Sequence, residues 1–209
     1  MLISALEPRR RSLCEVYLDG ESAGLLDLET LERLHVKMGQ EITDEDWSCL
    51  CAESDCTRAR SYALWLLSRR AMTRRGLVEK LRTRYSPEAS ETAARRAEEL
   101  GLIDDADYAA RCASDLFRFK SFSVPRVVTE LVHRGVDREL ARQTAEEVGR
   151  EYAPDPAEAI RVLLLGKYNR CLADEKGRRR AVAALQHMGY RWEEIRPVLR
   201  GLTEESAEE

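Results

Sequence analysis

A block of arginines with leucines between them is the part of this sequence best suited to bind anions. Residues 67–81 read LSRRAMTRRGLVEKL, which places Arg69, Arg70, Arg74 and Arg75 within seven positions. A guanidinium group can bind a carboxylate or a phosphate through two parallel hydrogen bonds. The chain as a whole is acidic, with 34 Lys and Arg against 38 Asp and Glu, so this block is a local feature. It predicts a surface for an anionic partner.

The positive charge extends on both sides of this block. Residues 58–84 contain nine cations and a single acid, Glu79, whereas residues 86–107 contain seven acids and two arginines. For any one arginine, a solvated position or an ion pair with these acids is the favoured interpretation. The whole cluster is harder to explain in that way, and it favours a partner-binding face. The candidate residues of this basic face, taken from all parts of the chain, are Arg69, Arg70, Arg74, Arg75, Arg82, Lys120, Arg126, Arg134, Arg178, Arg179 and Arg180.

Other kinds of site are poorly supported. Gly166-Lys167 lacks the glycine and the Ser or Thr of a phosphate-binding loop. The chain has only three histidines, and the spacing of Cys49, Cys51 and Cys56 does not suit zinc. Aromatic residues make up 6% of the chain, which is too few to predict a base-stacking surface. We therefore expect no enzyme, no cofactor and no metal.

The elements that must position the basic residues are helices in a repeated arrangement. Leu81, Leu131 and Leu185 occupy matching phrases 50 and 54 residues apart, and each is followed by a break at Tyr85, Gly135 or Gly189. A period of this length is typical of stacked helical units. The predicted helices are 59–70, 74–85 and 87–101; 105–120, 124–135 and 137–149; and 156–171, 177–188 and 192–202. Spacing assigns four leucines to the core, namely Leu64, Leu67, Leu77 and Leu81.

The first part of the chain has a different pattern. Residues 12–21 alternate apolar and polar side chains up to Asp19-Gly20, which predicts a hairpin. Residues 28–38 have helical spacing, and Thr43 suits the start of another helix running towards Cys56. We therefore predict a mainly α fold with three tandem three-helix repeats in an elongated curved array, preceded by a small α/β module. The predicted domains are the module 1–57, the repeats 58–104, 105–153 and 154–203, and an acidic tail 204–209.

Three phrases together resemble the bacterial regulatory protein RecX family. They are ALWLLSRRAMTRRGLVEKL at 63–81, LGLIDDADYAARCASDL at 100–116 and VPRVVTELVHRGVDRELARQTAEEV at 124–148. Within the third phrase, Arg126, Glu130 and Leu131 precede Arg134-Gly135 at the family's spacing. The likeness covers about residues 58–200. Two positions depart from the family pattern, because KSFSVPR lacks a glycine that is often present and Tyr85 stands where a glycine is common.

The resemblance implies a modulator of the RecA recombinase. Such a protein binds RecA and its filament on single-stranded DNA, mostly inhibits strand exchange and ATP hydrolysis, and belongs to DNA recombination, DNA repair and the SOS response. The resemblance leaves open whether such a protein also contacts DNA directly. It implies a protein without an active site of its own. A DNA-binding protein of helix-turn-helix type and a helical scaffold for another protein are the alternatives. With no secretory signal and no long apolar stretch, we expect a cytoplasmic monomer without membrane contact.

Overall fold

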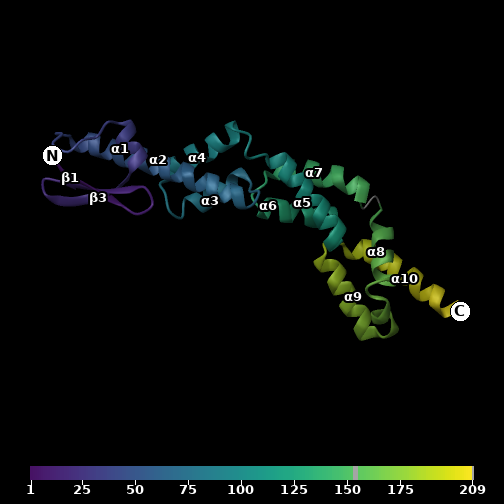
Figure 1. Ribbon diagram of the computed structural model, residues 1–209. Helices are drawn as coiled ribbons and strands as arrows, with labels where there is room; N and C mark the ends of the chain where they lie inside the picture. The colour runs from purple at the N-terminus through teal and green to yellow at the C-terminus, as the bar shows by residue number, and fades with distance from the viewer. Residues whose placement is uncertain (153–154, 209) are drawn as a thin grey trace. The chain divides into compact units, whose positions relative to one another are not determined.

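The computed structural model describes residues 1–152 and 155–208, with side chains up to residue 202 (Figure 1). The chain forms two compact units, Met1–Asp104 and Asp105–Glu209. The first unit contains β1 (Ile3–Arg9), β2 (Leu13–Leu18), β3 (Glu21–Asp27), α1 (Leu28–Arg33), α2 (Asp44–Arg69), α3 (Arg74–Leu81) and α4 (Pro87–Glu99). The second contains α5 (Asp105–Lys120), α6 (Val124–His133), α7 (Arg138–Tyr152), α8 (Pro156–Leu165), the 3₁₀ helix η1 (Asn169–Ala173), α9 (Glu175–His187) and α10 (Trp192–Glu208). The prediction of a mainly α fold with a small N-terminal sheet is confirmed.

The sheet is antiparallel in the order β1-β2-β3. The predicted hairpin joins β2 to β3 through Asp19 and Gly20, whose φ angles of 50° and 91° suit the type I′ turn of a two-residue loop. Along β2 the buried side chains alternate as predicted, with Cys14, Val16 and Leu18 facing the core. Strand β1 was not predicted, because its apolar residues do not alternate regularly. It pairs with β2 as an outer strand.

One face of the sheet packs on α1 and on the start of α2. The core here includes Ile3, Val16, Leu31 and Leu50. The predicted helix over residues 28–38 is shorter than expected, since α1 ends at Arg33. Of its expected apolar stripe, Leu34 and Met38 are exposed.

Helix α2 joins the sheet module to the helical part of the first unit. Thr43 caps it in a capping box with Asp46, as the sequence predicts. The expected break between Cys56 and Ala59 is wrong, because α2 continues to Arg69 and residues 44–69 contain no glycine or proline. The predicted boundary at residues 57 and 58 lies inside this helix, whereas the division into three repeats stays a prediction.

The C-terminal half of α2 packs against α3 and α4 (Figure 1). Small side chains on α2 and α4 let these helices approach closely, and Leu77 and Leu81 of α3 are fully buried beside them. Leu67 is partly buried against this core. The assignment of Leu64 to the core is wrong: 45% of it is exposed, because the buried side of α2 is set by Ala63 and Leu66.

In the second unit, α5, α6 and α7 surround one core and α8, η1, α9 and α10 surround another. The repeat leucines Leu131 and Leu185 are fully buried in these two cores. The predicted helix 156–171 is wrong in one respect, because α8 ends at Leu165 and η1 follows after a turn. Helix α10 begins at Trp192, the first residue of the predicted helix 192–202, and this side chain is 43% exposed.

The two cores of the second unit meet where α6 begins. The Ser123 N–H donates a hydrogen bond to the Met188 carbonyl over 3.0 Å, and the Tyr190 hydroxyl donates to the Ser121 carbonyl over 3.2 Å. Phe122 packs against both cores. Helix α10 continues to Glu208, so most of the expected acidic tail is helical in its backbone, and residue 209 lies outside the described residues.

Candidate partner-binding surfaces

The basic helix α3 owes its orientation to its cap and its apolar face. The Thr73 hydroxyl, itself buried, accepts a hydrogen bond from the Gly76 N–H over 3.1 Å and so starts the helix. Leu77 and Leu81 then bury one side of α3. The charged residues of a helix with one buried stripe must lie on its other sides. The predicted cations of α3, Arg74 and Arg75, are therefore held near the surface of the first unit.

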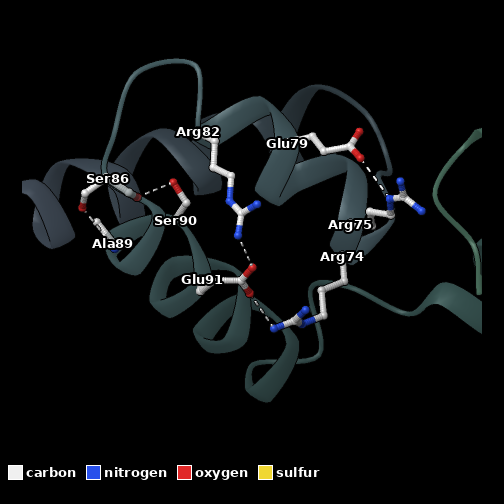
Figure 2. Close-up of polar contacts among 8 residues, drawn as sticks. All are labelled: Arg74, Arg75, Glu79, Arg82, Ser86, Ala89, Ser90 and Glu91. Atoms are coloured by element: carbon white, nitrogen blue, oxygen red, sulfur yellow. Dashed lines mark hydrogen bonds and ion pairs between the residues drawn. The ribbon is translucent and has the colours of Figure 1, made fainter.

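Two of these cations converge on one carboxylate of α4. Arg74 and Arg82 each place a terminal guanidinium nitrogen 3.0 Å from a different carboxylate oxygen of Glu91 (Figure 2). Arg74 also lies 3.3 Å from Glu98 through its Nε. These four residues form what we call the Glu91 cluster. All four side chains are substantially exposed, so the cluster lies on the surface.

Arg75 makes a separate pair within α3. Its Nε lies 2.9 Å from Glu79, the single acid of residues 58–84 (Figure 2). The two side chains are 68% and 62% exposed. Exposed pairs of this kind contribute roughly 0–1 kcal/mol, since water already solvates both charges. Arg74, Arg75 and Arg82 are thus paired with acids, yet each could exchange its acid for a partner's anion at little cost.

Arg69 and Arg70 lie at the C-terminal end of α2. The Arg69 guanidinium lies 5.2 Å from the centre of the Trp65 ring. Arg70 is the C-cap, with an extended backbone whose N–H donates to the Leu66 carbonyl over 3.3 Å. Cations are favourable at this end of a helix because the last carbonyl groups carry partial negative charge.

In the second unit, Lys120 is exposed in the last turn of α5 and Arg126 lies in the first turns of α6. Arg126 is less exposed than the cations of α3. It lies 2.7 Å from Glu130 and 5.3 Å from the centre of the Phe122 ring. Among the described residues, its buried Nε has no hydrogen-bond partner. This guanidinium is therefore only partly satisfied within the protein.

Arg134, the C-cap of α6, lies close to α5. Burial by itself lowers the pKa of the Arg134 guanidinium. The pKa is nevertheless raised overall, because electrostatic interactions with Cys112 and Glu130 and a hydrogen bond with Tyr108 outweigh the effect of burial. Arg134 therefore stays charged, and part of its bonding capacity is used inside the second unit.

The last predicted cations belong to α9. Arg178 donates to the Leu172 carbonyl over 3.0 Å, and Arg179 lies 2.5 Å from Glu175. Arg180 is exposed. The predicted cations thus fall into a first-unit set on α2 and α3 and a second-unit set on α5, α6 and α9. A single basic face that includes both sets stays a prediction.

The structure also brings together six residues that the sequence analysis did not group. Tyr62 and Trp65 of α2 stack with ring centres 5.6 Å apart and planes inclined by 12°, and Tyr85 lies 6.0 Å from Tyr62. An arginine lies against each ring. We call this set the aromatic–arginine cluster; its members are Arg58, Tyr62, Trp65, Arg69, Arg84 and Tyr85.

A sequence signal for this cluster exists. Arg58, Tyr62, Trp65 and Arg69 are spaced by four, three and four residues, which places them along one side of a helix. A low overall aromatic content does not exclude a local group of rings. The prediction that this chain has too few aromatic residues for a base-stacking surface stays a prediction, although three of its rings lie together here.

Two further findings concern absences in the described part of the chain. Where the structure describes side chains, in residues 1–152 and 155–202, no group of three or more His, Cys, Asp or Glu side chains could hold a metal ion. Within the same residues, no helix is both long and apolar enough to cross a bilayer.

Comparison with known proteins reveals similarity to regulatory proteins from several bacteria, although no family model matches the chain. Regulatory protein RecX of Caldanaerobacter subterraneus subsp. tengcongensis is 31% identical over 150 residues, which cover 71% of this chain and 76% of that protein. Regulatory protein RecX of Trichlorobacter lovleyi is 35% identical over 147 residues, which cover 68% of this chain and 92% of that protein.

Two solved structures share the fold. A crystal structure of a regulatory protein RecX matches 94% of this chain and 98% of its own with a TM-score of 0.62, at 20% identity. The structure of RecX from Lactobacillus salivarius matches 71% of this chain and 97% of its own with a TM-score of 0.59, at 19% identity. The identity and coverage of the sequence relatives, together with this shared fold, show that the chain belongs to the RecX family of regulatory proteins.

Proposed function

We propose that this chain binds the RecA recombinase, including its filament on single-stranded DNA, and mostly inhibits strand exchange and ATP hydrolysis. It acts in the cytoplasm as a monomer, through contact and without an active site of its own. The observation that carries the proposal is membership of the RecX family, together with the family resemblance of residues 58–200. Recombination, repair and the SOS response are the processes in which such a regulator would act.

The charged surface of the first unit supports this proposal. Arg69, Arg70, Arg74 and Arg75 are held at the junction of α2 and α3, and the ion pairs of Arg74 and Arg75 are exposed and weak. A filament offers many copies of the same protein surface and a run of phosphates. Several weak contacts on one molecule then act together, because the first contact raises the effective concentration of the others. The second-unit cations would supply additional contacts, and some of these could meet DNA directly.

The direct experiment adds the purified chain to RecA, single-stranded DNA and ATP. We expect ATP hydrolysis and strand exchange to fall at amounts of the chain at or below those of RecA. Unchanged rates at those amounts would contradict the proposal. Sequence-specific binding to duplex DNA in the absence of RecA would instead favour a helix-turn-helix protein.

The basic residues are tested by reversing their charge. A variant with Arg69, Arg70, Arg74 and Arg75 replaced by Glu should bind the RecA filament at least tenfold more weakly, with its helix content unchanged. A matched control replaces Arg95, Arg96, Arg111 and Arg142 by Glu; these four residues carry the same charge, are exposed and lie outside the predicted face. Circular dichroism checks the fold, and co-sedimentation with the filament measures binding. Equal loss of binding in both variants would show that the change in net charge, and not these four positions, causes the effect.

A further inference from the structure

The second unit has a pocket beside α8 whose chemistry differs from that of the basic residues. Its volume is about 330 Å³, which lies at the lower end of the usual range for ligand pockets, roughly 300–1,000 Å³. All of its lining belongs to the same compact unit. We call it the α8 pocket, which is lined by Phe117, Phe122, Tyr190 and one side of α8. A pocket of this size accommodates about one bulky side chain.

The aromatic lining of the α8 pocket is fixed by the protein itself. Phe117 and Tyr190 are almost completely buried, and the Tyr190 hydroxyl donates a hydrogen bond to the Ser121 carbonyl over 3.2 Å. Phe122 packs against both cores of the unit. Because these rings are held by their own contacts, a ligand would not have to order them, and this lowers the cost of binding.

Helix α8 has more apolar surface than its own core uses. Ile160 and Leu164 are fully buried in that core. Ala159, Val162 and Leu163 lie along a second side of the helix, because they are spaced by three and one residues, and all three line the pocket. Val162 is 61% exposed. A surface helix usually has one apolar stripe, which faces the core, so this second stripe indicates an apolar partner.

Two carboxylates continue the second stripe of α8 towards its N-terminus. Asp155 and Glu158 both line the pocket and are exposed. One oxygen of Asp155 caps the helix by accepting a hydrogen bond from the Ala157 N–H over 2.9 Å. In the part of the chain that the structure describes, neither acid forms an ion pair, and no Lys, Arg or His lines the pocket. The α8 pocket is therefore an apolar site with negative charge at one side.

We propose that the α8 pocket binds a peptide segment of a partner protein, in which one bulky apolar side chain stands next to Lys or Arg. The apolar side chain would pack against Phe117 and Tyr190, and the adjacent cations would pair with Asp155 and Glu158. Charge complementarity selects this occupant, because the carboxylates would repel a phosphate backbone or an acidic peptide. The inference goes beyond the proposed function, because this site is opposite in charge to the basic residues and needs no nucleic acid.

The test measures binding of three fluorescein-labelled hexapeptides to the full chain by fluorescence anisotropy in low salt. The first, the lysine–tryptophan peptide, has Trp-Leu at its centre and two lysines on each side. The second replaces all its lysines by glutamate, and the third replaces Trp-Leu by Ala-Ala. We expect the first to bind at least about tenfold more tightly than either of the others, since burial of one large apolar side chain typically has an effect of this size.

A variant that fills the pocket shows where the peptide binds. Ala159→Leu enlarges a side chain of the lining and should weaken binding of the lysine–tryptophan peptide at least about tenfold. Ala157→Leu is the matched control, since Ala157 is exposed on the same helix and does not line the pocket. Circular dichroism checks the fold. Should Ala159→Leu unfold the protein, Val162→Ser changes an exposed residue of the second stripe and should also weaken binding.

A second variant tests the carboxylates. Asp155→Asn combined with Glu158→Gln removes both charges while Asn still caps α8, and it should weaken binding roughly fivefold and make it less dependent on salt. Glu147→Gln combined with Glu193→Gln is the matched control, because these acids are exposed in the same unit but do not line the pocket. Binding by this control should equal that of the unchanged chain.

Four outcomes would overturn the inference. They are no binding of the lysine–tryptophan peptide at millimolar concentration, equal binding of the glutamate peptide, equal binding by the Ala159→Leu and Ala157→Leu variants, and binding of tryptamine as tight as that of the peptide. The last outcome would identify a small organic cation as the ligand in place of a peptide segment. None of these assays contains RecA, so failure of this inference and failure of the proposed function are distinguishable.

Discussion

At the scale of single residues, burial separates side chains that look alike in the sequence. Leu131 lies in the core formed by α5, α6 and α7 and is fully buried, whereas Leu64 lies on α2 with nearly half of its surface exposed. Both leucines occur in helices among other apolar residues. The difference arises from which side of each helix meets its neighbours, and it sets how much each residue contributes to stability.

Replacing these leucines should therefore have unequal effects. Leu131→Ala removes buried surface and leaves a cavity, so we expect the free energy of unfolding to fall by about 2–5 kcal/mol. Leu64→Ala is the matched control and should cost less than about 1 kcal/mol. Urea denaturation followed by circular dichroism measures both. Equal losses of unfolding free energy in the two variants would contradict the exposed position of Leu64 on α2.

The cysteines should differ in reactivity for a related reason. Cys14 and Cys112 are buried, and burial raises the pKa of both thiols above the ordinary value, so the reactive thiolate is scarce at neutral pH. Cys49 is exposed. Maleimide labelling at pH 7 followed by mass spectrometry should modify Cys49 first and Cys14 and Cys112 last. Because the pKa of each buried thiol is raised, its labelling should continue to accelerate above pH 9. Rapid labelling of Cys112 in the folded protein would contradict the packing of α5.

At the scale of elements, the ends of helices decide where one element meets the next. The turn after α9 packs directly on the start of α6, and Gly189 in that turn has a φ of 94°. A Cβ atom at this position would lie 2.4 Å from the Ser123 Oγ and 2.5 Å from the Arg126 Cβ. The turn after α4 is different, because Gly101 has a φ of 68° but no atom within 4 Å of such a Cβ.

These two glycines form a matched pair for testing the contact between the turn after α9 and the start of α6. Gly101→Ala should cost about 1 kcal/mol of unfolding free energy, since only the backbone is strained. Gly189→Ala adds a steric clash, which typically costs about 1–3 kcal/mol more. Thermal or urea unfolding of both variants gives the difference. A Gly189→Ala variant as stable as Gly101→Ala would show that α6 does not pack on this turn.

At the scale of the whole molecule, the chain divides into two units that each have their own hydrophobic cores. Residues 1–104 contain the sheet core and the core of α2, α3 and α4, and residues 105–209 contain the two remaining cores. Helix α2 connects the two cores of the first unit, because it is buried against the sheet near Leu50 and against α4 near Ala63.

This division predicts that each unit folds alone. A fragment of residues 1–104 and a fragment of residues 105–209 should each have a helical circular dichroism spectrum and a cooperative thermal transition. If RecA inhibition is then measured with each fragment, a requirement for both would support contacts from both sets of cations. A fragment that stays unfolded would contradict the independence of its cores.

Much of the fold follows from local sequence patterns. The burial of Leu77 and Leu81, the Asp19-Gly20 hairpin, the Thr43 cap and most helix starts depend on neighbouring residues, and the structure confirms these predictions. Two of the errors have a common cause, since the exposure of Leu64 and the length of α1 depend on which surfaces meet in space. Local periodicity cannot distinguish the buried side of a helix from an apolar side left in water.

The candidate sites show the same division. The order of the amino acids is enough to concentrate positive charge in residues 58–84 and acids in residues 86–107. Which group each arginine contacts depends on packing. Packing of α3 on α4 brings Arg74 and Arg82 to Glu91, while the chain after α3 brings Arg84 and Tyr85 back to the rings of α2. Charge is a property of composition, but pairing depends on distances that arise only when separate elements of the chain pack together.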